Sequence, residues 1–466
     1  MSSSYSPGWS IGFASLYKEL SEVSLEVSGA LPADLRGTLY QIGPGRFDLG
    51  TQSAGHWLDG FAMISSMRFD GPQATFTNRF LATSWYRRAL IEDTISAGGF
   101  DSPVAHHRNR RSFDNTNLNI VYHDHKLEAL GALPCSVFID ATTMATMESK
   151  PWKTPARCSG SAPHPFFDQS TGERFDLVLS AGDPAGYVIT VTGSMGTTRR
   201  LRSVPSSRIG YMHSFSVTPH WIILVEGPFT ASPRSLRSAR HPYLRNYVWD
   251  ASRGTRIYVL DRATGFLKTV LTTRPMFVLH HINAWEEGER IVTDLSAYAD
   301  PSILDALAFD QGRIAAGDFP APLATRLVIS LDTNRVVCLP LKSPPGEFSK
   351  IDPRVSMKPS TVVFSAGPSR TGGFIDRLGR SDIATGAFLQ WSSDNCYPGA
   401  PTFIPGGPNA AEGEGTLLSI VVDAATKRSF VLVLDAGTLT ELARAWLPIV
   451  LPFSLHGVFV PQEVPT

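Results

Sequence analysis

The most frequent pattern along the chain is a short run of β-branched or aromatic residues that ends in Asp and precedes a small polar turn. It occurs at Val137–Asp140, Ile257–Asp261, Val328–Asp332 and Val431–Asp435, and similar turns follow Asp168 and Asp382. Such a run is typical of a β-strand whose closing Asp accepts hydrogen bonds from the backbone of the turn. The pattern predicts an all-β fold, either a β-propeller of about seven four-stranded blades or a pair of β-sandwiches.

Two segments have apolar residues at helical spacing. Leu16–Val23 is short and amphipathic, and Ser302–Phe309 follows Pro301. We expect both to form short helices in loops. Gly and Pro are spread along the chain, and no low-complexity stretch or block of charge offers a domain boundary.

Composition and charge exclude several classes of protein. Hydrophobic residues make up 42% of the 466 residues and charged residues 18%, which argues against a disordered chain or a coiled coil. Lys plus Arg and Asp plus Glu both number 42, so the formal net charge is zero. Without a basic excess the chain has little to hold a phosphate backbone, and we expect no nucleic-acid partner.

The cysteines and the apolar runs predict where the protein resides. The four cysteines form no Cys-x-x-Cys pair, which favours reduced thiols in a cytosolic protein. The first residues, MSSSYSPGWSIGF, lack the pattern of a signal peptide. The longest apolar runs are far shorter than the roughly 18 residues of a spanning helix. We therefore expect a cytoplasmic protein that does not cross a membrane.

Four of the twelve histidines lie in apolar or strand-like sequence. They are His164 in SAPHPFFD, His213 in GYMHSFSV, His280 in FVLHHINAWEE and His456 in PFSLHGVFVP. Successive members are 49, 67 and 176 residues apart, so no local loop could gather them. Taken singly, each is more often an ordinary core or surface residue than a metal ligand. A propeller could gather them, because the innermost strand of each blade reaches the same axis.

Common catalytic motifs are absent, whereas one family's sequence features are present. The chain has no P-loop, no Gly-x-Gly-x-x-Gly, no His-Glu-x-x-His and no Gly-x-Ser-x-Gly. Its stretches LPADLRGTLYQIGPGRFDLG, GHWLDGFAMI, HHINAWEEGERIVTDLSAY and LHGVFVP resemble the carotenoid cleavage oxygenases. The likeness runs from about Leu31 to Gln462. The first half is nearest to the β-carotene oxygenase and retinal isomerohydrolase branch.

The resemblance implies a fold, a domain division and a metal site. It implies a seven-bladed β-propeller over residues 31–466, after an N-terminal arm of residues 1–30, with a few short helices in loops capping the metal face. One ferrous ion per chain would be held on the axis by His164, His213, His280 and His456. In the HHIN pair the ligand would be the histidine three residues before Asn283, hence His280. His281 would point to the opposite face of its strand.

The same resemblance implies partners for the histidines. In the family three of the ligands donate their second ring N–H to glutamates, which orient the rings and strengthen them as donors. One of these, Glu347, is present and expected behind His280. The other two positions fall on Leu130 and Ala400, although Glu128 lies close enough in sequence to take the place of the first.

The resemblance further implies an iron(II)-dependent dioxygenase that splits a carbon–carbon double bond of a carotenoid or apocarotenoid into two carbonyl products. Its partners would be an apolar isoprenoid and dioxygen. Tyr298, Phe453 and Leu455 are candidates for the substrate tunnel, and each could equally be ordinary core. The alternatives are a stilbene-cleaving or other phenylpropenoid-cleaving dioxygenase, an isomerase that cleaves an ester, and an isoprenoid-binding propeller with little activity.

The segment where a membrane contact would lie is Pro228–Val248. It carries Arg234, Arg237, Arg240 and Arg245 but few large apolar residues. Electrostatic contact with anionic headgroups and a solvated basic loop explain it equally well. We expect weak peripheral attachment at most.

Overall fold

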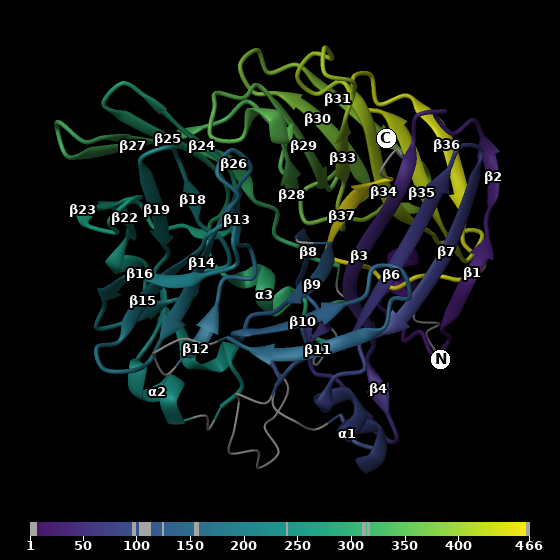
Figure 1. The fold of residues 1–466 in the computed structure, drawn as a ribbon, viewed down its shortest axis with the longest axis horizontal. Coiled ribbons are helices and arrows are strands. Elements are labelled where there is room, and N and C mark those ends of the chain that lie inside the picture. Colours follow the sequence, from purple (N-terminus) through teal and green to yellow (C-terminus); the bar gives the residue numbers. More distant parts are fainter. Residues whose placement is uncertain are drawn as a thin grey trace.

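The computed structural model describes residues 7–95, 99–101, 113–123, 125–152, 158–238, 241–309, 314 and 317–462. This part of the chain is built of β-sheets with few helices, and in Figure 1 the sheets follow one another around the molecule. The predicted all-β class is therefore confirmed. The seven-bladed propeller stays a prediction.

Seven sheets have four or more strands within the described residues. The first contains β1 (Leu20–Ser24), β3 (Arg36–Arg46), β6 (Phe61–Asp70), β7 (Gln73–Phe80) and β37 (His456–Pro461). The second contains β8 (Asn119–His123), β9 (Lys126–Leu130), β10 (Cys135–Ile139) and β11 (Thr146–Pro151). The third contains β12 (Cys158–Ser161), β13 (Phe166–Asp168), β14 (Glu173–Ser180), β15 (Gly186–Thr192) and β16 (Thr198–Pro205).

The other four large sheets follow in chain order. The fourth contains β18 (Ser216–Val217), β19 (Trp221–Glu226), β22 (Thr255–Asp261) and β23 (Leu267–Thr273). The fifth contains β24 (Phe277–Glu287), β25 (Arg290–Tyr298), β26 (Leu323–Ser330) and β27 (Arg335–Pro340). The sixth contains β28 (Glu347–Lys350), β29 (Val362–Gly367), β30 (Arg377–Asp382) and β31 (Phe388–Ser392). The seventh contains β2 (Glu26–Gly29), β32 (Cys396–Pro398), β33 (Thr402–Pro405), β34 (Gly415–Asp423), β35 (Arg428–Asp435) and β36 (Glu441–Trp446).

Two small sheets decorate this framework. They contain β17 (Ile209–Gly210), β20 (Phe229–Ala231) and β21 (Tyr247–Trp249), and β4 (Asp48–Leu49) and β5 (Gln52–Ser53). The helices are also short: α1 (Ser84–Glu92), α2 (Pro233–Ser238) and α3 (Ser302–Ala306). Short 3-10 turns include η1 (Gly8–Phe13), η2 (Trp57–Asp59), η4 (Leu244–Asn246), η5 (Ala251–Arg253) and η7 (Pro353–Val355).

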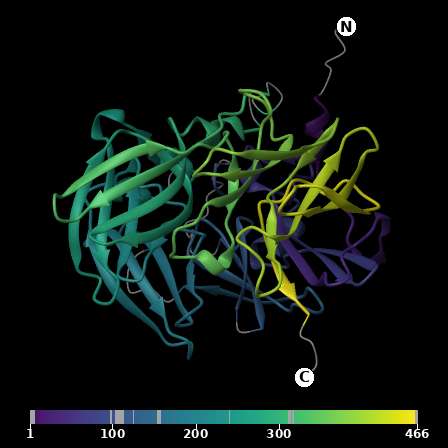
Figure 2. The ribbon, with the colours of Figure 1, turned by 90° about the horizontal axis from the view of Figure 1, so that it is seen from above.

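The two ends of the chain share sheets. β3 pairs with β37, with Ile42 opposite His456, and β2 pairs with β36. Figures 1 and 2 both show these N-terminal (purple) and C-terminal (yellow) strands side by side. The proposed N-terminal arm thus supplies β1 and β2 to two sheets. The division at residue 31 stays a prediction.

The predicted Asp turns follow the strands as expected. The Asp140 carboxylate accepts hydrogen bonds from the Thr143 N–H at 2.7 Å and the Thr142 N–H at 3.1 Å. Equivalent bonds join Asp261 to Thr264 and Asp435 to Thr438. These local bonds satisfy turn amides that no neighbouring strand reaches, which is why the pattern recurs.

One helix prediction is confirmed in part and the other is wrong. α3 covers the first five residues of Ser302–Phe309, after which Ala308 pairs with His56. Leu16–Val23 is not helical, because its second half forms β1 against β7. The Leu20 N–H donates to the Asn78 side chain at 2.8 Å, so tertiary pairing overrides the helical spacing.

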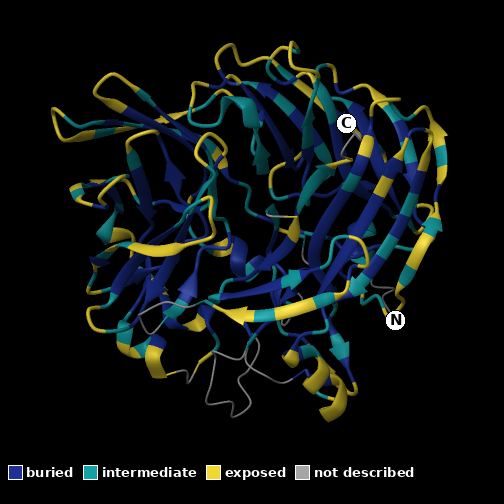
Figure 3. Cartoon of the chain, viewed as in Figure 1, coloured by how far each residue is buried: buried dark blue, intermediate teal, exposed yellow. Residues whose placement is uncertain are grey.

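Burial follows the position of each strand in its sheet (Figure 3). The interior of β35 is buried on both faces, because neighbouring sheets pack on both sides of it. The outer strand β27 alternates between half-buried and exposed residues. Among the described residues no helix is long and apolar enough to span a membrane.

Candidate metal centre

Four histidines from four different sheets or sheet edges meet in the interior. His164 lies between β12 and β13, and His213 lies between β17 and β18. His280 is in β24, and His456 begins β37. One ring nitrogen from each lies within 4.8 Å of the others. The structure therefore brings together all four histidines that the sequence singled out.

The geometry of the rings is that of a compact cluster. The ring centroid of His164 lies 4.5 Å from that of His456, 4.8 Å from that of His213 and 4.9 Å from that of His280. The Nε2 atoms of His280 and His456 are 3.1 Å apart. Metal–nitrogen bonds of about 2.1 Å at right angles would place two donor atoms about 3 Å apart. The spacing of the cluster thus fits a single metal ion.

Burial keeps the rings in the protonation state that a metal requires. It lowers the pKa values of His164, His213 and His456 well below the usual range, and neighbouring rings of the cluster lower them further. These rings are therefore neutral near pH 7, and a neutral imidazole has a free lone pair for a metal ion.

Only His280 has a carboxylate partner among the described residues of the cluster. Its Nδ1 lies 2.6 Å from Oε2 of Glu347, and the same oxygen accepts the Phe348 N–H at 2.8 Å. This contact turns the His280 Nε2 toward the other rings. The expected pairing of Glu347 behind His280 is therefore present in the structure.

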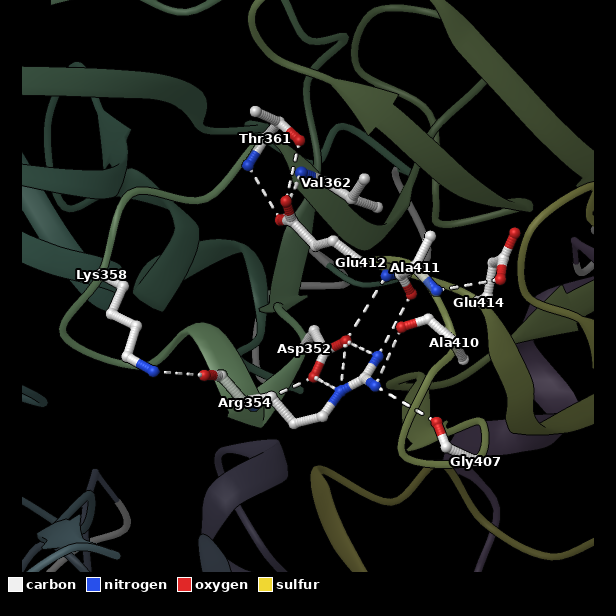
Figure 4. Close-up of polar contacts among 11 residues, drawn as sticks. Asp352, Arg354, Lys358, Thr361, Val362, Gly407, Ala410, Ala411, Glu412 and Glu414 are labelled. Atoms are coloured by element: carbon white, nitrogen blue, oxygen red, sulfur yellow. Dashed lines mark hydrogen bonds and ion pairs between the residues drawn. The ribbon is translucent and has the colours of Figure 1, made fainter.

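An ion-paired cluster just past the end of β28 holds the segment that carries Glu347 (Figure 4). Asp352 is fully buried, and the Arg354 guanidinium binds both of its oxygens, Nε to Oδ1 at 3.0 Å and Nη2 to Oδ2 at 2.5 Å. Arg354 also donates to the carbonyls of Ala410 and Ala411, both at 3.1 Å. These bonds fix β28 relative to the loop before β34, and we call the pair the Asp352–Arg354 clamp.

Among the described residues, the other three rings have a weaker hydrogen-bond partner or none. The Asn119 amide lies 3.3 Å from Nδ1 of His164. Nε2 of His164 and the Nδ1 atoms of His213 and His456 are buried without a hydrogen-bond partner in the part of the chain that the structure describes. Buried polar atoms normally have partners. A metal ion would satisfy Nε2 of His164.

The positions expected for further carboxylates are apolar. Leu130 is fully buried in β9, and Ala400 is 1% exposed just before β33. Glu128 does not replace the missing group, since its carboxylate pairs with Arg174 and accepts a hydrogen bond from Ser136. His281 lies outside the cluster, with its Nδ1 2.6 Å from the Ser216 hydroxyl.

An apolar cavity of about 130 Å³ adjoins the cluster. His213, His280, His456 and Glu347 line one part of it. Most of the remaining wall is hydrophobic and includes Phe13, Trp57, Tyr211, Leu304, Phe348 and Phe374. The three tunnel candidates Tyr298, Phe453 and Leu455 line it too. Burial and the nearby Glu347 carboxylate raise the pKa of Tyr298, so its hydroxyl stays protonated at neutral pH.

Sequence reasoning missed the residues that hold α3 over the cavity. The buried His56 ring reaches the Leu304 carbonyl, with Nε2 at 2.8 Å, and the Trp57 N–H donates to the Leu307 carbonyl at 3.0 Å. The Phe309 N–H in turn donates to Gly55 at 2.8 Å. The signal was present in the GHWLDG stretch, which marked the family but not this role.

The segment considered for membrane contact is partly tied to the protein. Arg245 pairs with Asp101 and Asp305, and Arg237 donates to the Ala181 carbonyl at 2.7 Å. Arg234 is exposed, and Arg240 lies outside the described residues. Membrane contact stays a prediction.

These features define a class of protein, in which an all-β framework places four histidines that fit a metal ion beside an apolar cavity. The family model described as retinal pigment epithelial membrane protein matches residues 13–461. The chain belongs to this family, and its resemblance to the carotenoid cleavage oxygenases is confirmed.

Individual relatives and solved structures are similar over nearly the whole chain. The beta,beta-carotene 15,15'-dioxygenase of Rattus norvegicus is 25% identical over 519 residues, which cover 96% of this chain and 90% of the relative. A mutant of Synechocystis apocarotenoid oxygenase superposes with a TM-score of 0.88 at 22% identity, covering 98% of this chain and 100% of that one. The cobalt-substituted Synechocystis protein gives 0.87 at 22% identity, with 98% of both chains covered. The two structures support the fold.

Proposed function

We propose that this protein is an iron(II)-dependent dioxygenase that cleaves a carbon–carbon double bond of a carotenoid or apocarotenoid into two carbonyl products. The observation that carries the proposal is the apolar cavity that adjoins the four-histidine cluster. The rat relative is named as a carotene dioxygenase and the Synechocystis structures as an apocarotenoid oxygenase, and the latter also exists in a cobalt-substituted form.

His164, His213, His280 and His456 are the proposed metal ligands, with one ion per chain. Four neutral imidazoles leave a divalent ion its full charge, which suits ferrous iron better than ferric iron. On an octahedral ion they leave two positions open. When bound, iron would supply the activation of dioxygen beside the substrate.

The chain's own residues would bind the substrate, orient it and exclude water. Tyr298, Phe453 and Leu455 are the proposed tunnel residues, since they line the cavity together with three of the histidines. An apolar wall holds a hydrocarbon in one orientation and keeps bulk water from the reacting bond. No protein acid or base is needed in this scheme.

We further propose that the framework is a seven-bladed propeller. Its support is the seven large sheets in the described residues and the pairing of N-terminal β3 and β2 with C-terminal β37 and β36. Such pairing of the two chain ends is what closure of a ring of blades requires.

The proposed activity is tested with iron-loaded protein in air and a panel of carotenoids, apocarotenoids and stilbenes. We expect two carbonyl products from an isoprenoid substrate, identified by mass, and label from isotopic dioxygen in both carbonyls. His280→Ala is the matched inactive control. Label from water alone would contradict a dioxygenase, products from stilbenes only would contradict the substrate class, and binding of isoprenoids without products would indicate a silent binding protein.

A further inference from the structure

The negative charge around the histidine cluster is concentrated on one side. Glu347 is 7% exposed and contacts His280 at 2.6 Å. A hydrogen bond from a ring N–H to a carboxylate orients the ring and makes its other nitrogen a stronger donor to a metal. His280 is therefore held and polarised by a charged partner.

The other rings lack an equivalent partner among the described residues. The hydrogen-bond partner of His164 within the described residues is the neutral amide of Asn119, at 3.3 Å. The Nδ1 atoms of His213 and His456 are buried with no hydrogen-bond partner in the described ranges. Because neither ring has a carboxylate acceptor, neither gains the added donor strength of His280.

Glu128 does not supply a second charge to the cluster, because its carboxylate is committed to Arg174 and Ser136. Among the described residues, a divalent ion at the cluster would thus have one nearby carboxylate, Glu347, to offset its charge.

We propose that, among the residues the structure describes, Glu347 is the single charged positioning residue of this centre, so that metal affinity and the electronic environment of the metal depend on that one carboxylate acting through His280. The inference rests on the metal-binding part of the proposed function. Loss of an outer partner usually costs about 10- to 100-fold in metal affinity, and we expect the Glu347 effect near the upper end.

The first test measures Co²⁺ affinity and the visible absorption of the bound Co²⁺ in the wild-type protein, Glu347→Gln and Glu128→Gln. Glutamine keeps the size of residue 347 and can accept a hydrogen bond, but it removes the charge. We expect Glu347→Gln to lower Co²⁺ affinity by about 10- to 100-fold and to shift the absorption bands. Glu128→Gln, a buried change away from the cluster, should leave the bands where they are in the wild type.

Two further measurements distinguish an effect of the lost charge from a general loss of folding. Thermal unfolding of the metal-free variants reports any loss of folding, and Glu347→Asp should recover part of the affinity because it restores the charge. Equal affinity and identical bands in wild type and Glu347→Gln would overturn the inference. A wild-type protein that binds no divalent metal would overturn the proposed function as well.

The second test adds charge instead of removing it. Ala400 lies just before β33, which packs against the β37 strand that begins with His456. Ala400→Glu would place a carboxylate near this second ring, and we expect Co²⁺ affinity to rise by about 10-fold. Leu130→Glu offers a second site if Ala400→Glu does not fold. Folded variants of both positions with unchanged or lower affinity would overturn the inference.

Discussion

The Asp352–Arg354 clamp lies just past β28, and the histidine cluster contacts Glu347 of β28, yet the two groups satisfy their polar atoms in different ways. In the clamp, both Asp352 oxygens and all three Arg354 nitrogens have partners, including the carbonyls of the loop before β34. In the cluster, three ring nitrogens are buried without partners within the described ranges. The first arrangement is complete as a protein structure, whereas in the second a metal ion would satisfy Nε2 of His164 and leave the Nδ1 atoms of His213 and His456 without partners.

This difference distinguishes stabilising polar groups from functional ones. A fully paired network contributes to folding, because every group removed from water regains its hydrogen bonds. Unpaired buried rings cost folding free energy, and they are retained where their lone pairs have another use. Substitutions in the two regions should therefore separate stability from metal binding.

The largest expected effect is the loss of a proposed ligand. His280→Ala should lower metal affinity by about 1,000-fold or more, or about 4 kcal/mol, since even outer partners cost up to about 100-fold. Metal content after dialysis against a chelator measures it. His281→Ala is the matched control and should keep its metal, because that ring binds Ser216 outside the cluster. The reverse result would reassign the ligand within the pair.

The neighbouring change in the clamp should affect folding and leave the metal in place. Asp352→Ala removes a buried carboxylate that accepts hydrogen bonds from Arg354, and it should lower the free energy of unfolding. Chemical denaturation measures this loss. Metal affinity of the folded variant should stay close to the wild-type value. A selective loss of metal with unchanged stability would mean that the clamp belongs to the site.

Asp168 is a second carboxylate that pairs with an arginine, and this pairing should make the stability of the protein depend on pH. Burial alone would raise the pKa of Asp168, but hydrogen bonds from Ser170 and Arg262 outweigh it and lower the pKa to about 2. The folded-state pKa lies below that of the unfolded chain, near 3.9. The stabilisation is therefore fully present above about pH 4 and is lost as the pH falls toward 2.

The variant Asp168→Asn tests the direction of this pH dependence. It should lower the free energy of unfolding by about 2 kcal/mol at pH 7 and flatten the pH dependence between about pH 4 and pH 2. Denaturation at several pH values measures both. A wild-type slope retained in the variant would assign that pH dependence to other carboxylates.

The sequence predicted the histidine cluster better than it predicted contacts between distant parts of the chain. The four histidines and Glu347 could be found because the family resemblance marks each one in its own stretch of sequence. The His56–Leu304 contact joins residues 248 positions apart, and no local pattern reveals such a partner. Leu16–Val23 failed for the same reason, since its strand exists through pairing with Asn78 and its neighbours in β7. The local sequence thus predicted which residues lie together in the cluster better than it predicted long-range contacts such as His56 with Leu304.

The smallest expected effect concerns Thr402, two residues after Ala400. Its hydroxyl is buried without a partner in the described part of the chain, and β33, which it begins, packs against β37. Thr402→Val keeps the shape and removes the hydroxyl. If the group is unpaired, stability should change by no more than about 1 kcal/mol, in the stabilising direction.

The same substitution also probes His456. A bridging water between the Thr402 hydroxyl and Nδ1 of His456 would give both atoms a partner. Thr402→Val would then lower stability and metal affinity together, and Thr402→Ser would restore both. If Thr402→Val instead leaves stability unchanged or raises it, and metal affinity does not change, His456 has no orienting partner in Thr402. This is the result expected if metal affinity depends on Glu347 alone.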